Sequence, residues 1–465
     1  MSCLLVADPE SPIWKIIMLH VLRIDWIRKH SLLLVATSAL VMVPGVLGQE
    51  PKELSSHDKS RLNQLREGKE AITASDKALL EQEARFQLHR LTQDKYWKRS
   101  PEGRTLDDYV EDTFKLMPMP TSQKPLTDPQ QQYMEAFADA YLGPIDEALH
   151  NRTPIVKVNA ARILARIAES VGGSFVTGQD KAASAQEKTA EECLKILKDK
   201  DQPDAVKLWA VRGLGGLFTT AYSASAVPVN ERPNRRAFKN SDLEDKCIVA
   251  LVEFVLRKPT LPPNPTPEEV EAFRYVRREA IRTLAQTRFP AVMNKKEFIG
   301  TPTALALTRV LVDDGITLTA SLSEKLEAAI GLCQLQTNLT DGYQPDYAAH
   351  IVGLFIVELG KIFNNRGNVP AGQIENYPWK YYATRLLEAL RAWKEANPPN
   401  DPKGSGKYIA ALFEKFDTEL RVVVRKQGLF NVNAIQAWLQ NPPPNSSLFK
   451  GHPEMVVKPA EAGDK

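Results

Sequence analysis

Apolar residues recur along this chain of 465 residues with the spacing of helices that bury one face. The clearest case is a stretch of ten residues that begins at Val156 and reads V-K-V-N-A-A-R-I-L-A. Four later stretches align with it without gaps and begin at Val206, Val276, Glu324 and Trp379. No segment alternates apolar and polar residues with period two, so the pattern predicts an all-α chain without a sheet.

Four columns of this alignment carry the pattern. The fifth column is always alanine and the ninth always leucine, and these positions lie one turn apart on the same helix face. A small residue beside a large one lets a neighbouring helix approach closely, so the two columns predict a packed face. The second column is basic in all five stretches, and the seventh is arginine in four. The second, fifth, seventh and ninth columns hold, in that order, Lys157, Lys207, Arg277, Lys325 and Lys380; Ala160, Ala210, Ala280, Ala328 and Ala383; Arg162, Arg212, Arg282, Ile330 and Arg385; and Leu164, Leu214, Leu284, Leu332 and Leu387.

Each patterned helix follows an apolar segment that is long enough to form a partner helix. We expect these partners at residues 130–150, 185–198, 243–257, 302–312 and 346–363. The third patterned helix has the clearest start, because Thr266 and Glu269 have the spacing of a capping box around a proline. Glycines at Gly213, Gly215 and Gly216 predict the end of the second patterned helix.

The pattern resembles the second helix of HEAT repeats, which belong to the HEAT/armadillo family of helical repeats, over roughly residues 128–393. The resemblance implies a right-handed superhelical solenoid of antiparallel helix pairs. It also implies an internal ladder, in which an acid near the turn inside one repeat pairs with the second-column cation of a neighbour. Asp201 and Glu271, six residues before two of the second-column cations, are the acids available for it. Successive alanines are 50, 70, 48 and 55 residues apart, against about 40–47 in such repeats, which predicts long loops or an added helix.

Residues 23–50 have the order of a secretory signal peptide. Arg23, Arg28 and Lys29 precede an apolar run over 31–43, and small residues end it near Gly48. A retained membrane anchor is the alternative, but the run is shorter than the ~20 residues that span a bilayer. We therefore expect an exported protein, periplasmic, envelope-associated or secreted, that is not held in a membrane after signal cleavage.

Composition sets the remaining boundaries. Prolines crowd residues 99–129, apart from a short helical piece at 106–116, and the chain from residue 442 is rich in proline, serine and lysine. The expected organisation is a signal peptide at 1–48, an N-terminal helical extension and linker at 49–127, a solenoid of about five repeats at 128–396, capping helices at 404–440 and a disordered tail at 441–465.

No sequence motif of catalysis or metal binding is present. The histidines lack metal-binding spacing, and the cysteines Cys193, Cys247 and Cys333 lie in apolar helical patterns, which favours buried small residues while leaving one disulfide open. The formal net charge of +3 argues against a dedicated nucleic-acid binder. We therefore predict no catalytic residue, no metal and no cofactor.

Three functions fit these features. The first is a non-enzymatic, exported scaffold that binds a protein partner along its stacked helices. The second is a carbohydrate-active enzyme on a helical toroid, which would need two carboxylates about 5–9.5 Å apart in one cleft. The third is a HEAT-like nucleic-acid binder that uses the second-column cations as a phosphate ladder, against which export and the low net charge both argue.

The longest departure from regular repeat spacing lies between Phe218 and Leu243. A loop of this length in a compact repeat protein is either functional or a solvated insertion. Its mixture of cations and aromatic rings would suit an acidic or aromatic partner surface. The candidate partner-binding residues are Tyr222, Arg232, Arg235, Arg236, Phe238 and Lys239.

Overall fold

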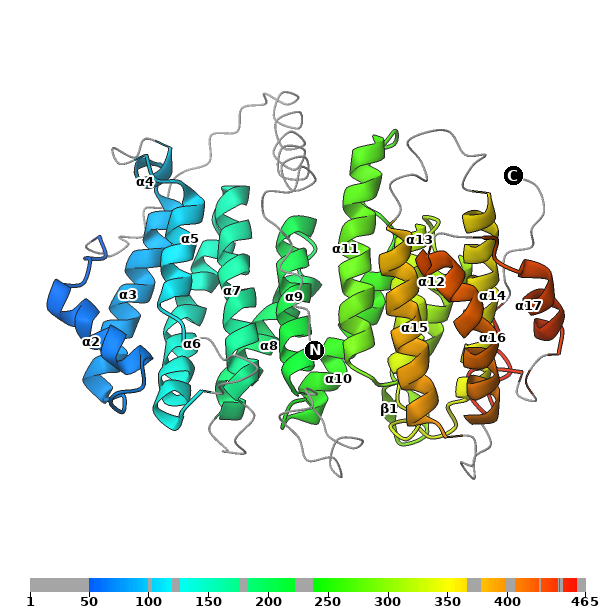
Figure 1. Ribbon diagram of the computed structural model, residues 1–465. Helices are drawn as coiled ribbons and strands as arrows, with labels where there is room; N and C mark the ends of the chain where they lie inside the picture. The colour runs from blue at the N-terminus through cyan, green and yellow to red at the C-terminus, as the bar shows by residue number, and fades with distance from the viewer. Residues whose placement is uncertain are drawn as a thin grey trace. The chain divides into compact units, whose positions relative to one another are not determined.

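The computed structural model describes residues 50–98, 103–118, 126–174, 182–221, 237–365, 378–398, 406–425, 428–441, 443 and 446–457. This part of the chain holds sixteen helices and one short hairpin, so the predicted all-α class is confirmed (Figure 1). The chain divides into two compact units, one within Met1–Gly213 and Thr260–Tyr275 and the other within Leu214–Pro259 and Val276–Lys465. No helix of the described residues is both long and apolar enough to cross a membrane.

In the first unit, α6 is the central helix and packs against α3, α7 and α8. The helix α5 packs against both α3 and α7. The helices of this unit are α2 (Ser56–Arg66), α3 (Ala74–Thr92), α4 (Asp94–Trp97), α5 (Leu106–Lys115), α6 (Asp128–Leu149), α7 (Pro154–Ser174), α8 (Ala182–Lys198) and the larger part of α9 (Asp204–Ala221).

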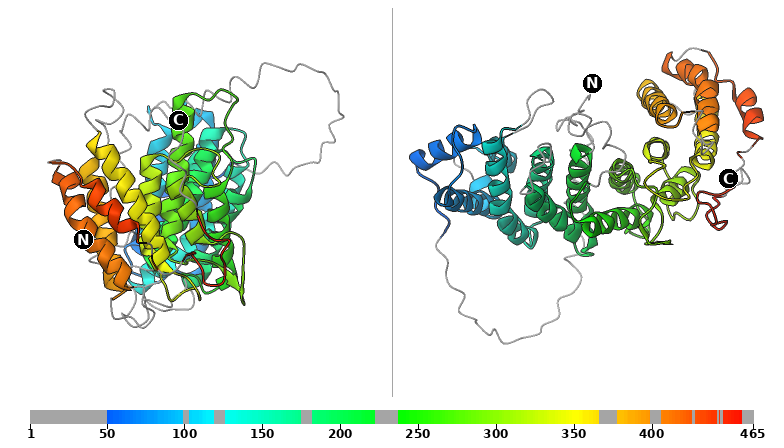
Figure 2. Two further views of the ribbon diagram at one scale, coloured as in Figure 1. Left: turned by 90° about the vertical axis from the view of Figure 1, so that its right-hand side faces the viewer. Right: turned by 90° about the horizontal axis from the view of Figure 1, so that it is seen from below.

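In the second unit, α13 packs against α12, α14 and α15, and α16 packs against α14 and α15. Figure 2 shows these C-terminal helices, coloured from yellow to orange, side by side. The elements are α10 (Ser241–Leu256), most of α11 (Pro267–Gln286), β1 (Met293–Asn294), β2 (Glu297–Phe298), α12 (Thr303–Val312), α13 (Leu322–Gln334), α14 (Pro345–Asn364), α15 (Trp379–Ala396), α16 (Gly406–Arg425) and α17 (Val432–Leu439).

Capping boxes mark the starts of the patterned helices α11 and α13. At α11 the Thr266 N–H donates to the Glu269 carboxylate at 2.9 Å, and the Glu269 N–H donates to the Thr266 hydroxyl at 3.3 Å. The same reciprocal capping box, with Ser321 and Glu324, starts α13. Each box satisfies backbone donors that the first turn of a helix leaves without partners.

The alanine and leucine columns form the packed faces. All five fifth-column alanines are fully buried, and the ninth-column leucines are no more than 8% exposed. The predicted packing face is therefore confirmed in each patterned helix.

The helix α9 does not end at its glycines, which corrects the expected stop. A Cβ added at Gly213 would lie 2.9 Å from the Cys193 Sγ and 3.4 Å from the Ala165 Cα. Gly213 thus allows α9 to approach α7 and α8 closely while the helix continues to Ala221.

The short helical piece expected at 106–116 is α5, and its Val110 is fully buried. One further expectation needs correction at the C-terminal end. The segment 446–457 is ordered although the whole of 441–465 was expected to be disordered. Its Leu448 carbonyl accepts a bond of 2.9 Å from the Gln344 N–H, and Phe449 is 1% exposed. A few apolar residues in a polar stretch, whose partners lie far away in sequence, hold it in place.

The hairpin of β1 and β2 corrects the expectation of a chain without strands. Its antiparallel strands pair Met293 with Phe298 and Asn294 with Glu297. Strands of two residues are too short to show an alternation of apolar and polar positions.

Shortening a ninth-column leucine tests this packing. We expect Leu284→Ala to lower the free energy of unfolding by about 2–5 kcal/mol, because Leu284 is fully buried and the change leaves a cavity. Leu429→Ala is the matched control, because Leu429 is 71% exposed. Urea denaturation followed by circular dichroism measures both, and equal effects would contradict the assigned helix register.

Candidate functional site

The second-column cations mostly point into the fold. Lys207, Arg277 and Lys325 are 7%, 2% and 8% exposed, whereas Lys157 is half-buried and Lys380 is exposed. A buried cation is tolerated only with a partner that compensates for its lost hydration.

Arg277 is neutralised from the next patterned helix. Its Nε donates to the Glu324 carboxylate at 2.5 Å, and its Nη1 donates to the Leu318 carbonyl at 3.0 Å. Glu324 stands in the first column of the fourth patterned stretch and also caps α13. Glu271, one of the two acids expected to pair with the second-column cation of a neighbouring repeat, pairs with Arg274 of its own helix at 2.7 Å.

Lys325 pairs with two acids of its unit, Asp313 directly after α12 and Glu358 on α14. Its Nζ lies 2.8 Å from the Asp313 carboxylate and 3.0 Å from that of Glu358. Burial acts to lower the pKa of Lys325, but the hydrogen bond to Asp313 and the charge of Glu358 outweigh it and raise the pKa. The ammonium is therefore retained inside the fold.

Two seventh-column arginines converge on one buried carboxylate in the second unit. Glu327 of α13 is 4% exposed; Arg282 of α11 donates to it at 2.7 Å, and Arg385 of α15 donates through both Nη atoms, one bond measuring 2.9 Å. Arg282 also pairs with Glu279 at 2.8 Å. We call Arg282, Glu327 and Arg385 the carboxylate clamp.

Charge sets the protonation of this clamp. Burial acts to raise the pKa of Glu327, but the hydrogen bond from Arg385 and the charge of Arg282 hold the pKa below its usual range. Charge-assisted, bidentate arginine bonds of this kind are among the stronger and more directional polar contacts in proteins.

The seventh-column arginines of the first unit lie against aromatic rings and acids. Arg162 of α7 pairs with Asp107 at 2.6 Å and with Glu111 at 3.2 Å, both on α5. Arg212 of α9 donates to the Tyr275 hydroxyl at 2.6 Å, and its guanidinium lies 5.0 Å from the centre of the Trp209 ring.

The arginines and aromatic rings of α7, α9 and α11 form a partly exposed surface. Arg166 belongs to it and lies one turn beyond Arg162 on α7. The side chain of Arg162 is 22% exposed and that of Arg166 is 37% exposed. Trp209, Arg212 and Tyr275 are also partly exposed, and α7 and α9 are neighbours through the close approach at Gly213. We call Arg162, Arg166, Trp209, Arg212 and Tyr275 the arginine strip.

The structure describes only two of the six loop residues that were predicted to bind a partner. Tyr222, Arg232, Arg235 and Arg236 lie outside the described residues. Phe238 is 2% exposed and stacks on Phe218, with ring centres 5.5 Å apart, so it belongs to the core rather than to an open surface. Lys239 is exposed. The arginine strip was missed as a site, although Arg162 and Arg212 stand in the seventh column, which is arginine in four of the five stretches.

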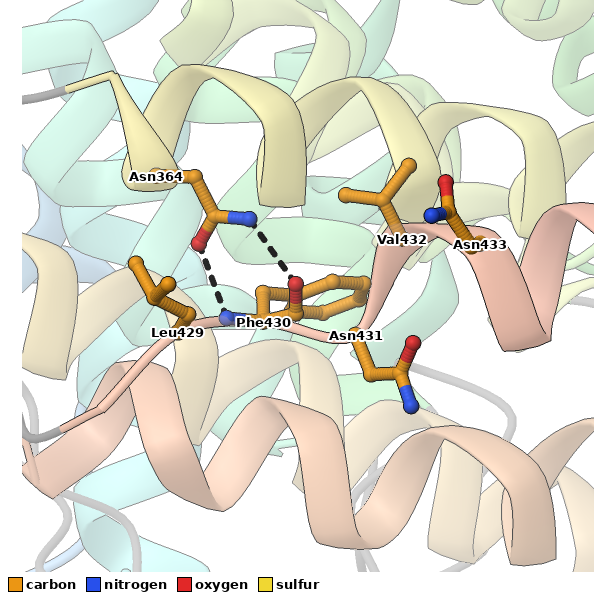
Figure 3. A pocket seen from close by; sticks show the side chains of 6 residues that line it. All are labelled: Asn364, Leu429, Phe430, Asn431, Val432 and Asn433. Atoms are coloured by element: carbon orange, nitrogen blue, oxygen red, sulfur yellow. Dashed lines mark hydrogen bonds between the residues drawn. The ribbon is translucent and has the colours of Figure 1, made fainter.

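A cavity of about 440 Å³ lies where the chain turns into α17 (Figure 3). The Asn364 side-chain amide makes two hydrogen bonds with the Phe430 backbone. It donates to the carbonyl and accepts from the N–H, at 2.8 Å each. The lining residues include no carboxylate and no histidine: Asn364, Leu429, Phe430, Asn431, Val432 and Asn433. This arrangement fastens the chain to α14 and offers no acid–base chemistry.

Among the described residues, no group of three or more His, Cys, Asp or Glu side chains is placed to hold a metal ion. Cys193, Cys247 and Cys333 are buried, as expected for small apolar residues. Burial raises the pKa of the Cys333 thiol well above its usual range.

Comparison of the chain with protein-family models gives no match, and comparison with curated proteins gives none either.

Removing the clamp's negative charge tests its energetics. We expect Glu327→Gln to lower the free energy of unfolding at pH 7 by about 3–5 kcal/mol, because two guanidinium groups lose their shared counter-charge. The folded-state pKa of Glu327 lies below the unfolded value, so its stabilisation is present above pH ~4.3 and lost as pH falls through the folded pKa.

Denaturation with urea at pH 7, 5 and 3 measures this dependence. As pH falls from 7 to 3, the free energy of unfolding should decrease more in the wild type than in Glu327→Gln, because the variant lacks the ionised carboxylate from the start. Glu388→Gln, an exposed change on α15, is the control and should cost less than about 0.5 kcal/mol. A clamp variant that behaves like this control would contradict the assigned role.

Proposed function

We propose that this chain is an exported, non-enzymatic scaffold that binds a protein partner through its patterned helices. The observation that carries the proposal is the arginine strip, in which the partly exposed Arg212 lies beside the Trp209 and Tyr275 rings. Arg, Trp and Tyr are the residues most enriched among the energetically important contacts of protein interfaces.

The geometry of the strip supports binding with little ordering cost. The Arg212 guanidinium is positioned by the Tyr275 hydroxyl at 2.6 Å and by the Trp209 ring. A side chain that is already fixed loses less conformational entropy on binding than a mobile one.

We further propose that the helix pairs stack as a right-handed solenoid of the HEAT/armadillo type. Buried alanine and leucine columns in five helices support this, because each such face needs a neighbour to cover it. The contacts of α6 with α7 and of α12 with α13 join a partner helix to its patterned helix, and the contact of α13 with α15 joins successive patterned helices.

The two alternatives have weaker support. A phosphate ladder would need exposed second-column cations, but Lys207, Arg277 and Lys325 are buried. For a hydrolase, Glu192 of α8 is the most suggestive acid, because burial raises its pKa despite the opposing bond to Lys195. Glu192 is only 6% exposed, and its carboxylate binds the Lys195 ammonium at 2.8 Å. A carboxylate covered and paired in this way is poorly placed to meet a sugar.

Export is tested on the native protein. We expect its mature chain to begin near Gln49, because a basic, apolar and small-residue order precedes that position. N-terminal sequencing of the protein from fractionated cells measures this. Recovery of a protein with an intact 23–47 segment in the membrane fraction would show that the segment is a membrane anchor and not a cleaved signal peptide.

Partner binding is tested by cross-linking and capture from the cell envelope with the tagged mature chain. We expect one protein to be enriched reproducibly, and the double change Arg166→Ser with Arg212→Ser to reduce its recovery at least about tenfold. Failure to enrich any protein would overturn the scaffold proposal.

The predicted loop is tested in the same assay by changing Arg232, Arg235, Arg236 and Lys239 to serine. We expect unchanged helicity and melting but weaker capture, more so at low salt, where exposed charges are least screened. Capture that is unaltered by these changes would remove the loop from the binding surface.

A further inference from the structure

The connection from α16 to α17 carries an apolar side chain that the fold of its own unit leaves in water. Leu429 is 71% exposed, and the other exposed large hydrophobic residues that the structure describes reach no more than 41%. Leu429 also lines the cavity of about 440 Å³, together with Val432 and Asn433 of α17 (Figure 3). A leucine in this position gains free energy if a second surface covers it.

The surface around Leu429 lacks charge. The sequence from 427 to 449 contains no Asp, Glu, Lys or Arg, although these residues make up 25% of the chain. Glu419 of α16 borders this surface, and its carboxylate accepts a bond of 2.7 Å from the Asn431 N–H. The exposed side chains of α17 itself are amides and alanines: Asn433, Ala434, Gln436 and Ala437. We call Leu429, the cavity and these exposed side chains the α17 surface.

The opposite face of α17 accounts for its packing within the second unit. Ile435 and Leu439 are buried, and the helix packs against α14. Gly353 of α14 leaves room for this contact, because a Cβ added there would lie 2.8 Å from the Leu439 Cδ2. The exposed face is therefore not needed to hold α17 in place. Depletion of charged residues around an apolar centre is the compositional feature of the core of a protein interface.

We infer that two copies of this chain associate through the α17 surface about a two-fold axis, with the Leu429 side chain of each copy in the cavity of the other. Such a contact sets a surface against itself, so a charged surface would be repelled by its mate. An uncharged surface that carries both a projecting leucine and a cavity can meet a second copy without that repulsion. An acidic or basic partner, by contrast, gains nothing from amides and alanines that it would not gain elsewhere.

The size of the cavity fits this arrangement. A cavity of ~150 Å³ holds a benzene molecule, so the cavity of about 440 Å³ has room for a leucine side chain. The α17 surface is distinct from the arginine strip, which lies in the first unit. The inference therefore goes beyond the scaffold proposal and does not depend on it.

Self-association is measured on the mature chain by sedimentation equilibrium. We expect a monomer–dimer equilibrium with a dissociation constant of about 1–50 µM, because one leucine and one short helix from each copy make a small interface. A chain that stays monomeric at about 200 µM, well above this range, would overturn the inference and leave the α17 surface to a different protein.

Two aspartate variants locate the contact. Leu429→Asp should raise the dissociation constant at least about tenfold, because association would bury an unpaired carboxylate from each copy. Ile299→Asp is the matched control, because Ile299 is an exposed apolar residue, at 41%, that does not line the cavity. Circular dichroism and melting below the dissociation constant, where the chain is monomeric, should be the same for Leu429→Asp and the wild type. Equal dissociation constants for the two variants would overturn the inference.

A disulfide between copies tests the fit of leucine into cavity. A tagged Leu429→Cys chain and an untagged Asn433→Cys chain, mixed under mild oxidation, should form a mixed disulfide, because the contact brings these positions of different copies within bonding distance. The native Cys193, Cys247 and Cys333 are buried and do not compete. Ile299→Cys replaces Asn433→Cys in the control and should remain unlinked. Equal cross-linking in the two mixtures would contradict the inferred contact.

Discussion

The burial of Glu327 is the constraint on which the packing of α11, α13 and α15 in the second unit depends. A carboxylate that is 4% exposed stays ionised only if its charge is matched within the fold. Arg282 and Arg385 match it from two different helices. Because the planar guanidinium bonds only in fixed directions, neither helix can slide along α13 without losing these bonds. The ninth-column leucines bring the helices close, and the clamp sets their register.

The distinction between features set within one helix and features set by neighbouring helices explains which parts of the structure were predictable. Burial of the fifth and ninth columns follows from helix geometry alone, since four residues make about one turn. Helix ends were predictable where local chemistry decides them. The helix expected at 346–363, for example, spans Pro345–Asn364. Neither inference needs to know which helix lies next to which.

Apart from the hairpin, the missed features depend on such neighbours. The acid of the Arg277 rung is Glu324, 47 residues later, and the acids beside Arg162 come from α5. The glycine rule for helix ends failed at Gly213, because its lack of a side chain serves contacts with α7 and α8. Phe449 is ordered by rings from elsewhere in its unit, Tyr343 at 5.6 Å and Phe298 at 4.9 Å. A short apolar group in a polar stretch gives no sign of such partners.

The two kinds of contact in the arginine strip have different energetic roles. Ion pairs between exposed groups contribute only about 0–1 kcal/mol each, because water and salt screen them. In the proposed scaffold, the arginines therefore contribute more to the choice and orientation of a partner than to its affinity. Burial of the Trp209 and Tyr275 rings removes apolar surface from water, which screening by salt does not weaken. For the proposed protein partner, affinity should consequently come mainly from the rings, and the arginines should determine its orientation.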